Sequence, residues 1–312
     1  MTTQSSVLVT GASGIIGHAV SEELKKQGYA EVLAPSHHEM DLTSPDSINH
    51  YMRRHLPTTV IHCAALSGSA DKMRSNAAAI LAENVLMQTN LMKAAAELSR
   101  KFVFLGSGSV YGPQADSPFK ESQAIQSIQQ GSLEGYAVSK IAGICLGKQY
   151  ARATGKPFIS VLPTHIYGCH ALDRRKEAVI DSLVVRLLEA KRDRLPEITL
   201  DIWGTGKLCK RQYLHVEDCA RAIVYLLENY DGEEPVNLAS EEAVSLDEVV
   251  REAQQTIGYE GAIHYLSDRP EVASARLMCM DKLKSLGFTP RYSLQSGIHQ
   301  VVEAYRLMLE KK

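Results

Sequence analysis

Residues 7–17 read VLVTGASGIIG, so an apolar run of three residues is followed by Gly11, Gly14 and Gly17. This spacing is typical of a strand that turns directly into a helix, because glycines allow a tight turn and close packing of the helix. The backbone of such a turn can approach a diphosphate, and the first turn of the helix offers N–H donors to it. The stretch predicts a dinucleotide site, although alone it could form only a tight strand-to-helix connection.

The first half of the chain alternates short apolar runs with longer helical patterns. The runs that predict strands are 7–9, 31–34, 59–62, 102–106 and 158–162. Helical patterns cover Ala70 to Ser99 and Leu133 to Thr154, and Ser44-Pro45 reads as the N-cap and first position of another helix. This alternation predicts an α/β fold: a Rossmann doubly wound parallel sheet with helices on both faces.

The second half predicts a smaller C-terminal α/β lobe. Its signals are a helix near 179–190, a strand at 198–202, and a terminal amphipathic helix near 293–309. Ser245 and Glu248 have the spacing of a capping box. A core helix resumes near 214–218, and a strand at 235–239 is expected to join the main sheet. We therefore expect two interleaved domains: 1–163 with 212–240 for the dinucleotide, and 164–211 with 241–312 for the substrate.

Bulk composition excludes several classes of partner. The 34 basic and 36 acidic residues leave no charge excess to attract nucleic acid, and 45% of the residues are hydrophobic, as in globular proteins. No apolar stretch has the length of a membrane span, and the six cysteines lack metal-ligand spacing. We expect a cytoplasmic protein with no nucleic-acid partner, no membrane association and no metal.

Two side chains four positions apart, Tyr136 and Lys140, share one helix face in the predicted helix. An ammonium group beside a phenol favours the phenolate and lowers a tyrosine pKa from its reference value of about 10. Ser107 follows the strand at 102–106, where open α/β sheets place ligands, and its hydroxyl can polarise a carbonyl. Ser107, Tyr136 and Lys140 are therefore the predicted catalytic residues, although a YxxxK string also occurs by chance.

The cofactor is expected to lie along the glycine turn and the ends of the neighbouring strands. After the second strand, residues 34–38 hold no carboxylate to bind a ribose 2′-hydroxyl and no arginine to bind a 2′-phosphate. The absence of a carboxylate favours NADP(H) slightly and leaves NAD(H) open. Ser36 or His37 would then contact the 2′-phosphate, although His37 and His38 could instead be solvated loop residues with no role in binding. The predicted cofactor-binding residues are Gly11, Ser13, Gly14, Ile15, Ile16, Gly17, Asp41, Leu42, Ala64, Ala65, Tyr136, Lys140, Pro163, His165 and Ile166. Asp41 could instead cap a turn, and the two alanines could serve packing alone.

Several motifs together resemble a known family. They are the TGxxGxxG start, SGSVYG at 107–112, YAVSKIAG at 136–143, LPTHIYG at 162–168, WGTGK at 203–207 and RQYLHV at 211–216. With these motifs the chain resembles, nearly end to end, the extended short-chain dehydrogenases/reductases that act on nucleotide sugars, and within them the GDP-L-fucose synthases. The resemblance implies NADP(H) in a Rossmann core, a nucleoside diphosphate in the C-terminal lobe, and a homodimer formed through helices that include the Tyr136 helix.

The same resemblance suggests the substrate-binding residues. They are Trp203 and Arg211 by position, Arg276 as a basic nucleotide contact, Arg186 as a looser candidate, and Ser109 and His165. Arginine suits a diphosphate because its guanidinium is a fixed, charged donor fork. Trp203 could equally fill a core between the lobes, and the arginines could be solvated surface charges.

Two positions depart from the family pattern. Ser109 stands where the family has a cysteine for epimerisation, and 172–175 lack the family's histidine. A hydroxyl is a far weaker acid than a thiol, whose reference pKa is about 8.5, so Ser109 is a poor proton shuttle. We therefore expect the protein to reduce the C4 ketone of a 4-keto-6-deoxy sugar that is linked to a nucleotide. GDP is the preferred nucleotide. The alternatives are a 4-epimerase, a full 3,5-epimerase/4-reductase in which His165 or His170 substitutes, and a non-catalytic dinucleotide sensor.

Overall fold

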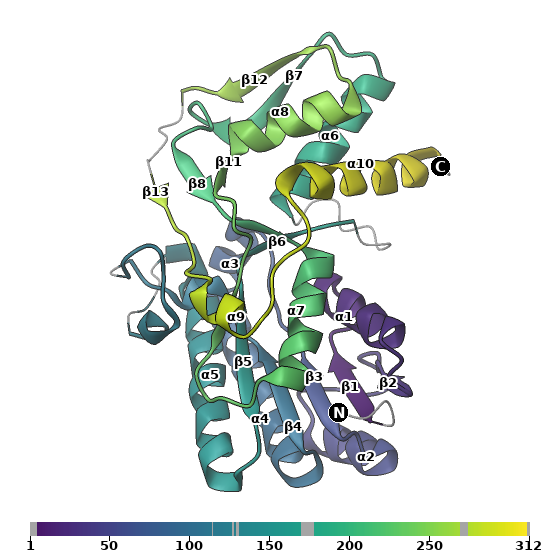
Figure 1. Cartoon of the computed structure of the whole chain (residues 1–312), viewed down its shortest axis with the longest axis vertical. Coiled ribbons are helices and arrows are strands. Elements are labelled where there is room, and N and C mark those ends of the chain that lie inside the picture. The colour runs from purple at the N-terminus through teal and green to yellow at the C-terminus, as the bar shows by residue number, and fades with distance from the viewer. Residues whose placement is uncertain are drawn as a thin grey trace.

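Six parallel strands form the central sheet, in the order β10-β5-β4-β3-β1-β2 (Figure 1). The computed structural model describes residues 5–113, 115–126, 128, 131–169, 178–268 and 274–310. The strands of this sheet are β1 Ser6–Thr10, β2 Glu31–Leu33, β3 Thr59–His62, β4 Lys101–Leu105, β5 Phe158–Pro163 and β10 Val236–Leu238. Each predicted strand of the sheet is confirmed to within one residue at its ends, because a strand buried on both faces reads as an unbroken apolar run.

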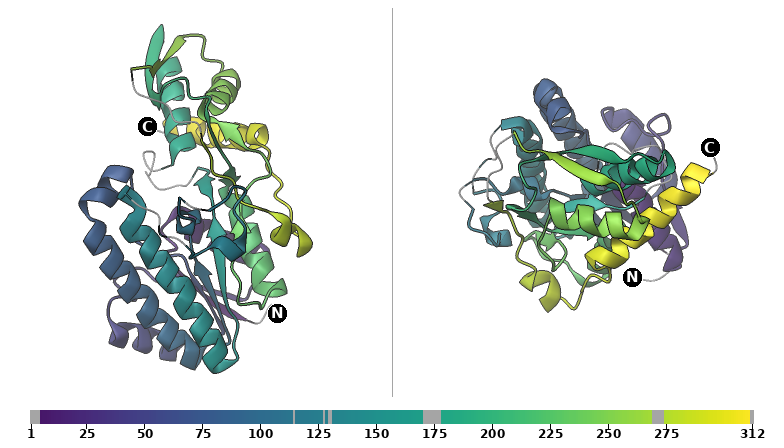
Figure 2. Two further views of the ribbon diagram at one scale, coloured as in Figure 1. Left: turned by 90° about the vertical axis from the view of Figure 1, so that its left-hand side faces the viewer. Right: turned by 90° about the horizontal axis from the view of Figure 1, so that it is seen from above.

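Helices cover both faces of this sheet. On one face α1 (Ile15–Lys26) packs against α7 (Val216–Asn229). On the other lie α2 (Pro45–His55), α4 (Ala77–Leu98) and α5 (Glu134–Thr154), and α4 and α5 run side by side in the left view of Figure 2. The Rossmann-type doubly wound fold is therefore confirmed.

The helical stretch predicted over 70–99 is interrupted. It consists of α3 (Ala70–Ser75) and α4, and Asn76 both ends the first helix and begins the second. Its φ of −119° lies outside the helical range, and its side-chain amide donates to the carbonyl of Lys72 at 3.2 Å. Asparagine competes with the helical backbone for hydrogen bonds, which accounts for the break.

The smaller lobe stands on top of the sheet in Figure 1. It contains α6 (Val179–Arg192), α8 (Leu246–Ile257) and α10 (Leu294–Glu310), and β7 (Glu197–Trp203) pairs there with β12 (Ala262–Leu266). The predicted capping box is present, since Ser245 Oγ accepts from the N–H of Glu248 and the Glu248 carboxylate accepts from the N–H of Ser245. The remaining short elements are β6 His165–Tyr167, β8 Cys209–Arg211, β9 Tyr213–His215, β11 Val244–Ser245, β13 Ser274–Ala275, α9 Asp281–Ser285 and the 3₁₀ turns Gly108–Val110, Glu121–Gln123 and Gly131–Leu133.

Two hydrophobic clusters mark the two lobes. The larger surrounds the sheet, and the smaller joins α6, α8 and α10. Met278, Leu283 and Phe288, which follow β13, pack in the larger cluster. The domain boundaries given above stay a prediction. Residues 278–288, which that prediction assigns to the smaller lobe, contribute side chains to the hydrophobic core around the central sheet.

A buried carboxylate connects the lobes. Asp218 in α7 is fully buried and accepts from the backbone N–H groups of Arg291 and Tyr292, both at 2.8 Å, and from the Arg221 guanidinium at 2.5 Å. Arg291 and Tyr292 lead directly into α10. The carboxylate therefore fixes the chain that enters the terminal helix of the smaller lobe.

We predict that Asp218→Ala lowers the free energy of unfolding by about 3–5 kcal/mol, because two backbone donors and a guanidinium lose their buried acceptor. Urea denaturation followed by circular dichroism measures the change. Glu241→Ala is the control: its carboxylate pairs with Lys284 at 3.0 Å on the surface, so its removal costs less than about 1 kcal/mol. Equal destabilisation by both variants contradicts the assignment of Asp218 as the connecting group.

Candidate active site

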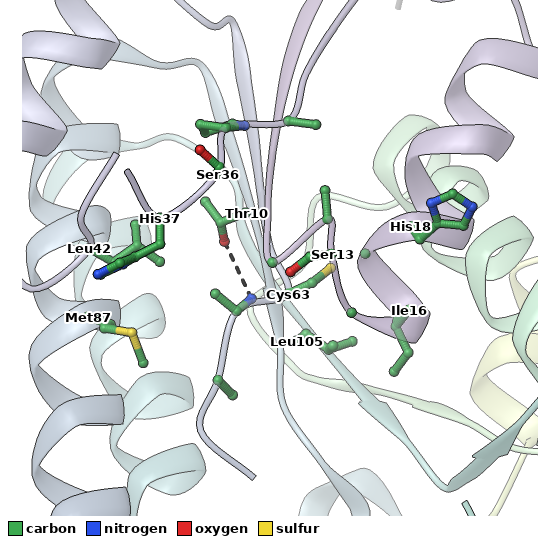
Figure 3. Close-up of a pocket in the computed structure, with 18 of the residues that line it drawn as sticks. Thr10, Ser13, Ile16, His18, Ser36, His37, Leu42, Cys63, Met87 and Leu105 are labelled. Atoms are coloured by element: carbon green, nitrogen blue, oxygen red, sulfur yellow. Dashed lines mark hydrogen bonds between the residues drawn. The ribbon is translucent and has the colours of Figure 1, made fainter. Parts of the chain in front are cut away.

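A cavity of about 830 Å³ opens at the carboxyl ends of β1 to β4 (Figure 3). Twelve of the predicted cofactor-binding residues line it: Gly11, Ser13, Gly14, Ile15, Ile16, Gly17, Asp41, Leu42, Ala64, Ala65, Tyr136 and Lys140. The other three do not line it, because Pro163 ends β5 and His165 and Ile166 lie in β6. The structure therefore brings together the residues of the glycine turn, the strand ends and the YxxxK helix.

The glycine turn is packed too closely for side chains. A Cβ on Gly17 would lie 2.3 Å from the carbonyl oxygen of Gly11, and one on Gly11 would lie 2.6 Å from the backbone nitrogen of Ala64. Gly11 also has a φ of +69°. Gly14 is the N-cap of α1, and the first turn of that helix contains no acidic residue. This N-terminus therefore presents an environment suited to a diphosphate.

The loop after β2 holds a carboxylate that the sequence interpretation did not use. Both the N–H and the hydroxyl of Ser36 donate to the Glu39 carboxylate, each at 2.8 Å, and these bonds lower the pKa of Glu39. Asp41 accepts from the N–H and hydroxyl of Thr43 at 2.9 and 2.7 Å, as the turn-cap alternative expects. The Nδ1 atom of His37 lies 3.9 Å from Asp41. The Ser-x-x-Glu spacing at 36–39 is typical of a serine that hydrogen-bonds to a carboxylate three residues later, so the sequence could have indicated the contact between Ser36 and Glu39.

His62 ends β3, and Cys63, the next residue, lines the cavity. The hydroxyl of Thr10 is 2.8 Å from Nδ1 of His62, and the N–H of Ala64 donates to the same hydroxyl at 3.4 Å, the bond drawn in Figure 3. Burial lowers the pKa of His62 to about 3 and raises that of the Cys63 thiol to about 12, so both groups are neutral near pH 7. Within the described ranges no cluster of three or more His, Cys, Asp or Glu side chains could hold a metal ion.

The three predicted catalytic residues come together. Ser107 follows β4, and its side chain lies near enough to the Tyr136 hydroxyl of α5 to oppose the rise in the pKa of that phenol. The Nζ atom of Lys140 lies 5.6 Å from the centre of the Tyr136 ring and donates to the carbonyl of Leu105 at 2.8 Å. A hydroxyl, a phenol and an ammonium group are therefore adjacent at the end of β4, next to the cavity.

Lys140 by itself does not lower the Tyr136 pKa in this structure, and the further lowering expected from an oxidised nicotinamide stays a prediction. Burial raises the pKa of Tyr136 to about 12, and the Ser107 side chain opposes this only in part. Burial also lowers the pKa of Lys140 to about 8. Desolvation is the largest influence on each side chain, so Tyr136 holds its proton at neutral pH.

Three of the proposed substrate contacts converge from different elements. Arg211 ends β8, Arg276 follows β13, and the positive charges of both act on His165 in β6. Arg211 donates to the hydroxyl of Ser274 at 3.1 Å, and Arg276 donates to the carbonyl of Tyr111 and lies 4.9 Å from the centre of the Phe119 ring.

The other proposed contacts lie in separate elements. Trp203 ends β7 with half of its surface exposed (50%). Arg186 in α6 donates to the carbonyl of Thr199 in β7. The Ser109 hydroxyl is buried and has no hydrogen-bond partner among the described residues. His170 and 172–175 lie outside the described residues.

The part of the chain that the structure describes contains no helix both long and apolar enough to span a membrane.

Known proteins resemble this chain over nearly its whole length. The chain is 33% identical to GDP-L-fucose synthase 1 of Arabidopsis thaliana over 303 residues, which cover 96% of this chain and 93% of that protein. It is 28% identical to GDP-L-fucose synthase of Escherichia coli, with 98% and 97% covered. Among solved structures, a GDP-6-OMe-4-keto-L-xylo-heptose reductase from C. jejuni superimposes with a TM-score of 0.87 at 25% identity, over 99% of both chains.

The model of the NAD dependent epimerase/dehydratase family matches residues 7–239, from the first strand to the end of the last strand of the sheet. This match spans the glycine turn, Ser107, Tyr136 and Lys140. The chain belongs to the NAD dependent epimerase/dehydratase family, and its Rossmann-type sheet and YxxxK pair are those of an extended short-chain dehydrogenase/reductase.

Proposed function

We propose that the protein reduces the C4 ketone of a GDP-linked 4-keto-6-deoxy sugar, with NADPH as the preferred reductant and NADH as the alternative. The observation that carries this proposal is that Ser107, Tyr136 and Lys140 come together at the end of β4, next to the cavity that the glycine turn opens. The names of the related GDP-L-fucose synthases and of the C. jejuni 4-keto-heptose reductase support a GDP-linked keto sugar as substrate.

The cavity fits a dinucleotide. Gly11 and Gly17 leave no room for a Cβ atom, so the turn stays close to the sheet, and its backbone would hold the diphosphate. Ala64 and Ala65 line the cavity and would leave space for the adjoining ribose. Ser36 and His37 line the cavity beyond β2 and would meet a 2′-phosphate. Bound there, NADPH supplies the hydride of the reduction.

The chain itself supplies the proton. Because the pKa of Tyr136 is about 12, its hydroxyl is protonated at neutral pH and can donate to the oxygen that develops negative charge at C4. Ser107 would hydrogen-bond the same oxygen. Lys140 is anchored to the Leu105 carbonyl and would orient the phenol and the cofactor ribose.

Ser109 supports reduction without epimerisation. A serine hydroxyl does not ionise near neutral pH as a thiol can, so it cannot readily move the protons bonded to C3 and C5. Its Oγ is buried and has no hydrogen-bond partner among the described residues, so its surroundings do not favour an ionised group.

We predict that Tyr136→Phe lowers kcat for reduction of GDP-4-keto-6-deoxymannose by about 10²–10⁴-fold, because the proton donor is lost. NADPH fluorescence titration should give an affinity close to that of the unchanged protein. Tyr150→Phe is the matched control, since it removes a hydroxyl from the same helix. Retained turnover in Tyr136→Phe removes this residue from the role of acid. Dinucleotide binding without turnover in the unchanged protein would instead support a non-catalytic dinucleotide sensor.

Incubation in deuterated water separates reduction from epimerisation. We predict that the protein consumes NADPH with GDP-4-keto-6-deoxymannose and that mass spectrometry finds no solvent deuterium on carbon. Deuterium at C3 and C5 contradicts the proposed loss of epimerisation and supports a full 3,5-epimerase/4-reductase. Conversion of a nucleotide sugar without net NADPH consumption supports a 4-epimerase instead.

We also propose a homodimer formed through α4 and α5. The outer face of α4 carries Ala78, Ala79, Ala82 and Leu86, and Leu86 is 45% exposed. Glu83 is exposed beside these residues, so the first half of α4 offers a small apolar patch with one charge, and we propose that a second copy of the chain covers it.

We predict that Leu86→Lys converts the dimer to a monomer in sedimentation velocity, because a charge enters the apolar contact. Leu195→Lys changes a leucine of similar exposure (44%) in the loop between α6 and β7 and should leave assembly unchanged. A protein that is monomeric before substitution contradicts the dimer.

A further inference from the structure

We propose that Glu39 competes with the 2′-phosphate of NADPH for the hydrogen-bond donors of Ser36, and that this competition limits the preference of the protein for NADPH over NADH. The inference rests on the cofactor named in the proposed function and is independent of the sugar. It makes Glu39 a specificity-determining residue that acts against the phosphorylated cofactor.

The Glu39 carboxylate closes the turn that follows β2. Its Oε2 atom accepts from both the N–H and the hydroxyl of Ser36, each at 2.8 Å. In return, the Ser36 carbonyl accepts from the N–H groups of Glu39 and Met40, at 3.1 and 3.0 Å. A single carboxylate oxygen therefore occupies both donors that Ser36 offers to an anion.

A cofactor in the cavity can reach this turn. Ser36, His37 and Glu39 are exposed and line the cavity, and Figure 3 shows Ser36 and His37 at its border. In a Rossmann-type sheet the chain just after the second strand meets the 2′ position of the adenosine ribose, which is a hydroxyl in NADH and a phosphate in NADPH. The donors of Ser36 therefore lie where the two cofactors differ.

The loop supplies little positive charge to offset the carboxylate. Residues 34–42 contain no lysine or arginine. They carry a second carboxylate, Asp41, which lies 3.9 Å from Nδ1 of His37. On the neighbouring helix α1, the cavity-lining Lys25 is paired with Glu22 at 2.8 Å. An incoming phosphate thus meets two carboxylates in the loop itself.

Displacement of Glu39 separates the two cofactors. A 2′-phosphate that takes the donors of Ser36 must displace the carboxylate and remain close to it, where the two negative charges repel each other. A ribose hydroxyl carries no charge and can leave the bonds between Glu39 and Ser36 intact. Because the loop is exposed, solvent screens the repulsion and keeps its effect within about tenfold in affinity.

Fluorescence titration with NADPH and with NADH tests the inference on Glu39→Gln. The glutamine keeps an oxygen for the donors of Ser36, so the turn is retained, but it is neutral and competes less well with a phosphate. We predict that the Kd of NADPH decreases by about threefold to tenfold, whereas the Kd of NADH stays within about twofold.

Glu31→Gln is the matched control. It removes an exposed carboxylate from the first residue of β2, at the other end of the strand from the turn. Because Glu31 does not line the cavity, this variant should change neither Kd by more than about twofold.

An unchanged Kd of NADPH in Glu39→Gln overturns the inference. So does a parallel change in both Kd values, which is expected if Glu39 only holds the loop in shape. Failure of both dinucleotides to bind the unchanged protein refutes the inference and the proposed cofactor together.

NADPH oxidation with GDP-4-keto-6-deoxymannose, measured on the same preparation, tests the reductase separately. Turnover by the unchanged protein without a selective gain in NADPH affinity in Glu39→Gln refutes the role of Glu39 alone. A selective gain without turnover supports the role of Glu39 and refutes the proposed reduction alone.

Discussion

The backbone contact between α1 and the turn that precedes it is the constraint on which the site depends. At Gly17 the helix lies so close to the carbonyl of Gly11 that a Cβ would be 2.3 Å away, and Gly11 in turn meets the backbone at Ala64. Three segments from β1, α1 and the end of β3 therefore meet without side chains between them. This contact directs the N-terminus of α1 into the cavity, where its N–H groups can meet an anion.

Burial sets the electrostatics of the residues around this cavity. Tyr136 holds its proton and Lys140 binds its proton less firmly, because desolvation penalises the charged form of each. An acid that is protonated at neutral pH suits reduction, in which the chain must give a proton to an oxygen. His62 follows the same rule, since burial lowers its pKa to about 3. The described residues at the end of β4 therefore include a phenol that is protonated at neutral pH.

Local patterns predicted much of the fold. The unbroken apolar runs at 7–9, 59–62 and 158–162 identified buried parallel strands, and Ser245 with Glu248 identified the start of α8. The break at Asn76 was not predicted, because the alanine-rich residues on both sides favour a helix and the side-chain bond that interrupts it depends on local geometry. Glu39 was missed as well, since its bond to Ser36 forms only when the loop after β2 folds back.

The sequence by itself determined the chemistry available: a glycine turn for a dinucleotide, a Tyr136 and Lys140 pair on one helix face, and hydroxyl groups at Ser107 and Ser109. These features follow from residue type and short spacing, which a chain carries in any environment. Only the tertiary structure decided which groups meet and how they titrate. Arg211, Arg276 and His165 come from β8, the segment after β13 and β6, and the pKa of Tyr136 rises because the fold removes water from it. Desolvation and long-range Coulomb interactions depend on neighbours far along the chain, so no local pattern encodes them.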